Sequence, residues 1–117
     1  MKITLLDSNG KSKTYKKAHA NMEDAMATMQ FQLNQKVRYS NNDAIKEMKP
    51  DELEMLYIQR NYDAYNDAVK LIVSVFDNQF EVEDVLRSVK RKDFSDLVDE
   101  IITEVMNGES EEKKGNK

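Results

Sequence analysis

The sequence predicts a mainly α-helical α+β fold, in which an N-terminal β-hairpin precedes a bundle of about four helices that includes one long helix. Apolar residues alternate weakly around an Asn-Gly pair near the start, whereas later apolar residues recur every three or four positions. At 117 residues the chain can bury one modest core. We expect a single domain over residues 1–108 and a disordered tail over 109–117, which contains no apolar residue.

The composition argues against several classes of protein. Cysteine is absent, which excludes disulfides and thiolate chemistry and favours a cytoplasmic location. No apolar run is long enough to span a membrane, and the first residues lack the pattern of a secretory signal. Ten basic and eighteen acidic residues give the segment 21–108 a net charge of −8, which repels a phosphate backbone. We expect neither a membrane nor a nucleic acid as partner.

The hairpin is predicted over residues 1–18. The Asn-Gly pair at residues 9–10 suits a two-residue turn. An isolated two-stranded hairpin is marginal in water, so it must lean on helices or pair with the edge of another chain. Few apolar side chains are available for its inward face: Ile3, Leu5 or Leu6, and Tyr15.

Four helices follow from apolar periodicity and from residues that favour helix ends. Asn21 is expected to cap the first helix, Pro50 to begin the second, and Asp93 to cap the last. The basic run at residues 90–92 is placed at the end of the third helix, where the helix dipole favours positive charge, rather than at a phosphate site. The predicted ranges are 21–37, 50–77, 81–90 and 93–107.

The helix over 21–37 carries an apolar stripe in which methionine dominates. Methionine is adaptable and is common at surfaces that accept varied apolar partners. We prefer the interpretation that the stripe fills an irregular core, and an exposed binding stripe is the alternative. The stripe consists of Met22, Met26, Met29, Leu33 and Val37.

The helix over 50–77 has the strongest periodicity in the chain. Its second half is apolar nearly all round and should be buried, whereas its first half is polar outside the stripe. The first half should project and pack against another subunit or a partner helix through Tyr57, Tyr62 and Tyr65. A break near Asn61 is the competing interpretation. The stripe runs through Met55, Ile58, Tyr62, Tyr65, Val69, Ile72 and Phe76.

A polar corner separates the second and third helices, and both of its phenylalanines can enter one core. We assign its polar residues to helix capping and packing rather than to partner contact. The corner comprises Phe76, Asn78, Gln79, Phe80 and, at the start of the third helix, Asp84.

Nothing in the sequence suggests an enzyme, a metal site or a cofactor site. The single histidine, His19, lies between alanines without a defined acidic partner. Carboxylates are plentiful, but the Glu-x-x-His pairs of a dimetal site and a glycine-rich phosphate loop are missing. We expect no catalytic residues.

The corner also carries a resemblance. The pattern of Val73, Val75, Phe76, Asn78, Gln79, Phe80, Asp84 and Val85, followed by Ile101, Ile102 and Val105, resembles the small tail assembly chaperones of long-tailed siphophages that infect Gram-positive bacteria. Ile3-Thr4-Leu5, Asn9-Gly10-Lys11 and Tyr15-Lys16 look like the opening strand pair of that family. The segment 37–65 is longer and richer in tyrosine than the family pattern.

The resemblance implies a non-enzymatic role in the host bacterial cytoplasm. Members of this family bind and solubilise the tape measure protein during tail morphogenesis and are absent from the mature virion. A homo-oligomer and a longer form made by ribosomal frameshifting are also implied as partners. Lys113-Lys114-Gly115 is compatible with an adenine-rich slippery sequence in the coding strand.

Two surfaces are candidates for contact with the client or with neighbouring subunits, on the reasoning that an amphipathic helix buries its apolar stripe in a groove of similar spacing. Two other hypotheses remain open. One is a small acidic helical regulator or inhibitor that binds a folded protein, and the other is a coiled-coil dimerisation module. The candidate residues are Met22, Met26, Met29, Tyr57, Tyr62 and Tyr65.

Overall fold

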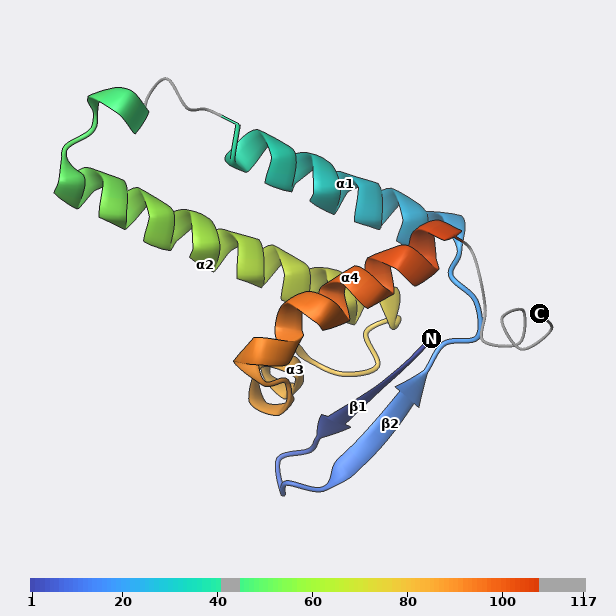
Figure 1. Ribbon diagram of the computed structural model, residues 1–117. Helices are drawn as coiled ribbons and strands as arrows, with labels where there is room; N and C mark the ends of the chain where they lie inside the picture. Colours follow the sequence, from blue (N-terminus) through green and yellow to red (C-terminus); the bar gives the residue numbers. More distant parts are fainter. Residues whose placement is uncertain (41–44, 108–117) are drawn as a thin grey trace.

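The computed structural model describes residues 1–40 and 45–107, and within them it contains one two-stranded antiparallel sheet and four α-helices (Figure 1). The predicted α+β, mainly helical fold is therefore confirmed. The tail predicted over 109–117 lies outside the described residues. In chain order the elements are β1 (Lys2–Leu6), β2 (Ser12–Lys16), α1 (Met22–Arg38), the 3₁₀ turn η1 (Ile45–Glu47), α2 (Pro50–Val75), α3 (Val82–Ser88) and α4 (Arg91–Asn107).

The hairpin forms as predicted, but its turn is longer than the two residues expected from the Asn-Gly pair. Asp7 organises this turn, because its Oδ1 accepts hydrogen bonds from the backbone amides of Asn9 (2.8 Å) and Lys11 (2.9 Å). The Asp7 amide donates to the Lys11 carbonyl at 2.8 Å. Gly10 adopts a φ of +81°, which glycine tolerates without steric cost.

Helix α1 begins with the predicted Asn21 cap. Asn21 Oδ1 accepts from the Asp24 amide at 2.9 Å, and Asp24 Oδ2 accepts from the Asn21 amide at 3.0 Å, so the two residues form a capping box. Asp24 also pairs with Lys17, whose Nζ lies 2.6 Å from Asp24 Oδ2 and 2.9 Å from Asp77 Oδ1. This cluster joins the end of the hairpin, the start of α1 and the corner after α2.

The Lys17 ammonium in this cluster is almost completely covered, since the side chain is 8% exposed. Burial lowers its pKa, but hydrogen bonds and charge interactions with Asp24 and Asp77 outweigh burial. The pKa of Lys17 therefore lies above its ordinary value of 10.5.

Helix α2 is continuous from Pro50 to Val75, so the alternative of a break near Asn61 is wrong. Proline at the first position has no amide hydrogen to satisfy, and Asp51 and Glu52 in the first turn suit the positive end of the dipole. The helix ends two residues before the predicted boundary, because Asp77 takes a left-handed conformation with φ +58°.

The corner after α2 is a Schellman motif. The Asn78 amide donates to the Val73 carbonyl at 2.9 Å and the Asp77 amide donates to the Ser74 carbonyl at 3.0 Å. The Gln79 side chain donates to the Lys16 carbonyl at 3.0 Å and so ties the corner to β2. Both rings enter the core, with centroids of Phe76 and Phe80 5.7 Å apart.

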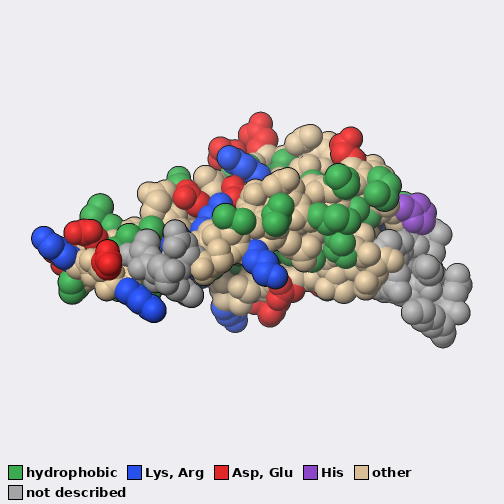
Figure 2. All heavy atoms as spheres, turned by 90° about the horizontal axis from the view of Figure 1, so that it is seen from above, with side chains coloured by type: hydrophobic (Ala, Val, Ile, Leu, Met, Phe, Trp, Pro, Cys, Tyr) green, Lys and Arg blue, Asp and Glu red, His purple; other side chains and the backbone are tan. Residues whose placement is uncertain are grey.

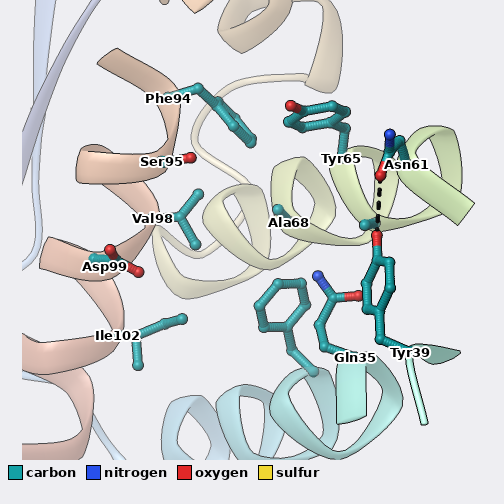
Figure 3. Close-up of a pocket in the computed structure, with 12 residues that line it drawn as sticks. Gln35, Tyr39, Asn61, Tyr65, Ala68, Phe94, Ser95, Val98, Asp99 and Ile102 are labelled. Atoms are coloured by element: carbon teal, nitrogen blue, oxygen red, sulfur yellow. Dashed lines mark hydrogen bonds between the residues drawn. The ribbon is translucent and has the colours of Figure 1, made fainter. Parts of the chain in front are cut away.

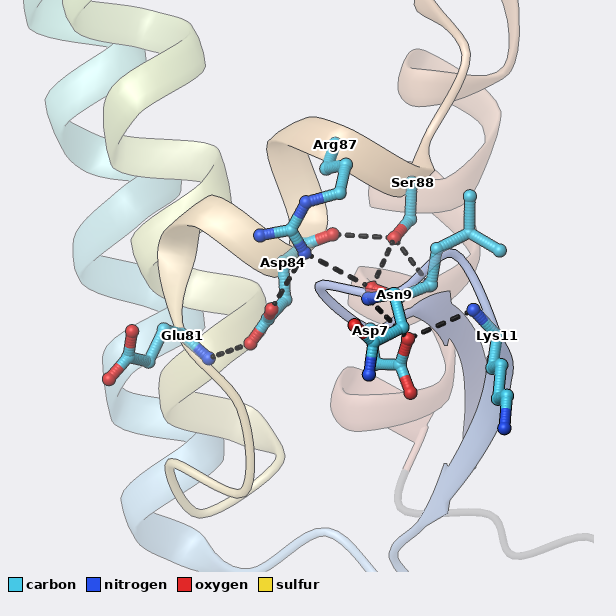
Figure 4. A network of polar contacts seen from close by, with 8 residues as sticks. Asp7, Asn9, Lys11, Glu81, Asp84, Arg87 and Ser88 are labelled. Carbon is cyan, nitrogen blue, oxygen red and sulfur yellow. Dashed lines mark hydrogen bonds and ion pairs between the residues drawn. The ribbon is translucent and has the colours of Figure 1, made fainter.

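Helix α3 binds the end of strand β1 in the hairpin (Figure 4). Ser88 Oγ accepts from the Leu6 amide at 2.6 Å and donates to the Asp84 carbonyl at 2.6 Å. Arg87 donates to the Leu6 carbonyl at 3.2 Å and pairs with Asp84 at 3.0 Å. Asp84 also caps α3, since its carboxylate accepts from the Glu81 amide at 2.9 Å. The hairpin therefore packs against a helix of its own chain, which was one of the two arrangements expected for it.

Helix α4 begins at Arg91, two residues before the predicted cap Asp93. The Asp93 amide instead donates to the Lys90 carbonyl at 3.0 Å, within the first turn. Arg91 and Lys92 consequently lie at the positive end of the α4 dipole, and their assignment to the end of α3 is wrong. That position disfavours positive charge by about 0.3–1 kcal/mol at an exposed site.

The core forms where the second half of α2 meets the hairpin, the corner, α3 and α4. The first half of α2 extends beyond α3 and α4 (Figure 1). We call residues 50–62 the projecting segment. Fully buried large side chains include Leu5, Val69, Ile72, Val75, Phe76 and Val85.

Candidate protein-binding surface

Helix α1 exposes the whole apolar stripe that the sequence suggested would fill the core. The three methionines range from 44% to 71% exposed, so the preferred core-filling interpretation is wrong and the alternative of an exposed stripe is correct. In Figure 2, which views the molecule from the side of α1, hydrophobic side chains form a broad band. We call this band the methionine face: Met22, Met26, Met29, Leu33 and Val37.

The orientation of α1 follows from a buried polar pair that apolar periodicity does not reveal. Asp24, Thr28 and Phe31 are its buried residues. Asp24 is satisfied by Asn21 and Lys17, and Thr28 Oγ1 donates to the Asp24 carbonyl at 2.8 Å. At about 100° per residue, this buried side lies opposite the methionine face. The capping box in the sequence was the one signal for this orientation, because it places Asp24 near the chain that enters the helix.

Helix α2 carries a second exposed apolar face. In the second half the stripe is buried at Val69 and Ile72, whereas the same side of the helix continues uncovered into the projecting segment. The predicted contrast between a buried half and a projecting half is therefore confirmed. We call the uncovered part the α2 stripe: Met55, Ile58, Tyr62 and Tyr65.

The α2 stripe ends in an apolar groove of about 420 Å³ between α2, α3 and the start of α4. Leu86 lines this groove and is 63% exposed. Arg91 lies at the same groove and supplies its positive charge. The lining residues are Tyr62, Tyr65, Asn66, Val69, Val85, Leu86, Val89, Arg91 and Phe94.

A second depression, of about 330 Å³, lies between α1, α2 and α4 (Figure 3). Tyr65 borders both hollows, and its ring packs edge-on against Phe94 with centroids 5.6 Å apart. Tyr39 closes one end, since its hydroxyl is 3.3 Å from Asn61 Oδ1. Near this closure Arg38 pairs with Asp67 at 2.6 Å, which fixes α1 against α2.

The six candidate residues are all exposed, but they do not form one surface. Met22, Met26 and Met29 lie together on α1, and Tyr62 and Tyr65 lie together at the groove. Tyr57 is five residues from Tyr62, about 140° around the helix, and so projects from another side of α2. The two surfaces also contain exposed apolar residues that were not among the candidates: Leu33, Val37, Met55, Ile58 and Leu86.

The single histidine and two aspartates of α2 are the polar side chains whose surroundings bear on catalysis or metal binding. His19 is exposed. Asp63 accepts from Gln59 at 3.0 Å, and Asp67 pairs with Arg38. Within residues 1–40 and 45–107, no cluster of acidic or histidine side chains could hold a metal ion. No helix in the described part of the chain is sufficiently long and apolar to cross a membrane.

The fold and its surfaces define a small hairpin-and-helix protein whose most prominent surface features are two uncovered apolar helix faces. The chain belongs to the phage tail chaperone family, because the model of that family, described as "Phage tail chaperone protein", matches residues 1–117. Searches among curated proteins and among solved structures gave no significant match. Membership supports a role as a tail assembly chaperone and implies protein partners in tail assembly. It also suggests a non-enzymatic protein.

Proposed function

We propose that this tail assembly chaperone binds the phage tape measure protein and keeps it soluble while the tail is assembled in the host bacterial cytoplasm. On this proposal it is not part of the mature virion. A longer frameshifted form of the chain, if made, would carry the same apolar faces.

The exposed methionine face is the observation that carries this proposal. Five apolar side chains along one side of α1 have no partner surface within the described part of the chain. Contiguous exposed apolar patches usually mark interaction sites. Unbranched methionine side chains adjust to partners of varied shape, which suits a client that presents many different apolar segments.

The α2 stripe and its groove supply a second contact surface of different chemistry. Tyr62 and Tyr65 offer apolar rings with polar tips, which suits a contact that is wet on one side. An amphipathic client helix could place residues at i, i+3, i+4 and i+7 along either face. Several copies along one long client would bind more firmly than each copy alone.

Co-expression with the tape measure protein encoded by the same phage tests the proposal. For this experiment the affinity tag is placed at the C-terminus, because Met1 packs into the core and is only 6% exposed. We expect a soluble complex that contains the tape measure protein, which is insoluble when expressed alone. Equal insolubility with and without the chain, and no recovery on the affinity resin, would refute the proposed client.

A pair of variants identifies the surface. Met26→Glu places a charge in the centre of the methionine face, and we expect recovery of the client to fall at least tenfold. Gln32→Glu adds the same charge at an exposed position of α1 outside that face and should leave recovery unchanged. Circular dichroism should show the same helix content for both variants. Equal recovery with both variants would exclude the methionine face as the client surface.

A further inference from the structure

Methionine is concentrated on the face that carries the proposed function. The chain has seven methionines, and three of them lie in the first half of α1. Their side chains are between 44% and 71% exposed, and none of the three belongs to the hydrophobic core. Three thioether side chains are therefore open to small solutes along one short stretch of helix.

The three methionines share one side of α1. Steps of four and three residues place Met22, Met26 and Met29 within about 60° of one another around the helix axis. Along the axis, the rise is about 6 Å from the first to the second and about 4.5 Å from the second to the third. A chemical change at these three positions therefore alters one continuous patch of the methionine face.

The chain also contains methionines that serve as internal references. Met1 is buried in the core, so a dissolved oxidant reaches its sulfur only when the structure opens. Met106 is partly exposed near the end of α4, outside both apolar faces. The reactivity of the methionine face can therefore be compared with a buried and with a distant methionine in the same molecule.

Hydrogen peroxide converts methionine to methionine sulfoxide. The sulfur lone pair attacks one peroxide oxygen, so that an S–O bond forms and the O–O bond breaks. The proton of the attacked oxygen passes to the other oxygen, which leaves as water. The thioether loses two electrons, and the peroxide gains them. The product is polar and accepts hydrogen bonds, so its burial in an apolar contact without a donor costs free energy.

From this placement we propose that the methionine face is a reversible oxidation site that controls client binding. Peroxide converts Met22, Met26 and Met29 to sulfoxides, the face loses its apolar character, and the tape measure protein is no longer held. Methionine sulfoxide reductases, one for each sulfoxide epimer, restore the apolar face. The effect on the client rests on the proposed function, whereas the selective oxidation of the face does not.

Mass spectrometry of the full chain after timed exposure to hydrogen peroxide provides the first test, without any client. We expect Met22 and Met26 to gain oxygen at least about tenfold faster than Met1. Circular dichroism should show unchanged helix content, because the three side chains lie outside the core. Equal oxidation rates at Met1 and at the methionine face, or loss of helix content as the face is oxidised, would overturn the proposal.

The second test dilutes denatured tape measure protein into buffer that contains the chain and measures how much stays in solution. After oxidation and removal of the peroxide, the chain should keep at least about tenfold less in solution, and treatment with both reductases should restore most of the loss. In the triple variant Met22→Leu, Met26→Leu and Met29→Leu, the amount should be the same before and after peroxide. Met106→Leu should lose as much as wild type.

The possible failures are distinguishable. An untreated chain that keeps no tape measure protein in solution would refute the proposed function, and with it the effect of oxidation on the client. An untreated chain that succeeds, and succeeds equally after complete oxidation of the three methionines, would overturn this inference alone. So would a loss that the reductases do not reverse, or an equal loss in the triple variant.

Discussion

Two consecutive left-handed residues end the longest helix of this protein. Asp77 and Asn78 both have φ of +58°, a conformation in which the Cβ atom crowds the backbone of most residues. Asn and Asp tolerate it better than other non-glycine residues. The Asn78 amide closes the Schellman motif, so this conformation also positions Phe80 for the core.

Substitution at Asn78 should therefore depend on backbone freedom rather than on lost side-chain contacts. Asn78→Val should lower the free energy of unfolding by about 1–2 kcal/mol, because a β-branched residue is strained in the left-handed region. Asn78→Gly should leave stability near the wild-type value or above it. Urea unfolding followed by circular dichroism measures both, and equal stability of the two variants would contradict this account of the corner.

Lys17 is the cation that joins three elements through Asp24 and Asp77. Lys17→Ala leaves the Asp24 carboxylate buried without its positive partner, which should cost about 3 kcal/mol of unfolding free energy. The neighbouring Lys16 has an exposed side chain, so Lys16→Ala should change stability by less than about 0.5 kcal/mol. Similar losses in urea unfolding for both variants would rule out a structural role for the cluster.

The raised pKa of Lys17 sets the direction of its pH dependence. A group whose pKa is higher in the folded than in the unfolded state stabilises fully below its unfolded value of 10.5. That contribution declines as pH rises through the folded-state pKa. The stability difference between wild type and Lys17→Met should therefore be constant from pH 7 to about 9 and should shrink above pH 10.5. A difference that grows in alkaline solution would contradict the assignment.

At the scale of the element, α2 combines a buried half with a projecting half along one apolar stripe. Ile72 is completely buried and Ile58 is 62% exposed, yet both belong to the same periodic pattern. Sequence periodicity identifies the stripe but not where its cover ends, because cover depends on how far α3 and α4 reach along the helix. The second half of the helix is apolar nearly all round, and this change in composition was the signal for the boundary.

Matched truncations on this stripe should separate the two halves. Ile72→Ala should lower the free energy of unfolding by about 2–5 kcal/mol, because it opens a cavity in the core. Ile58→Ala should cost less than about 0.5 kcal/mol in dilute protein, where its side chain remains in water. Urea unfolding at low protein concentration gives both values. A large loss for Ile58→Ala would mean that the projecting segment is covered even in the monomer.

At the scale of the whole molecule, the hairpin, the four helices and the polar corner after α2 were predictable because each has a local signal in the sequence. The helix boundaries near residues 90–93 were not predictable. Asp93 could be the N-cap of a helix that begins after it, or it could lie in the first turn of a helix that begins at Arg91, as it does. The side of α1 that faces the core was not predictable either. It is set by Asp24 and Thr28, which are buried with their polar groups paired, whereas residue type alone assigns both to the surface. The exposure of the methionine face follows from that orientation.

The proposed function requires that the two apolar faces contact the tape measure protein. Photo-crosslinking with a benzophenone amino acid at Met26 or Ile58, in the soluble co-expressed complex, tests for this contact. Thr103 and Glu83 are exposed positions outside both faces and serve as controls. We predict crosslinks to the tape measure protein from Met26 and Ile58 and few from the controls. Crosslinks to it from the controls alone would contradict the account.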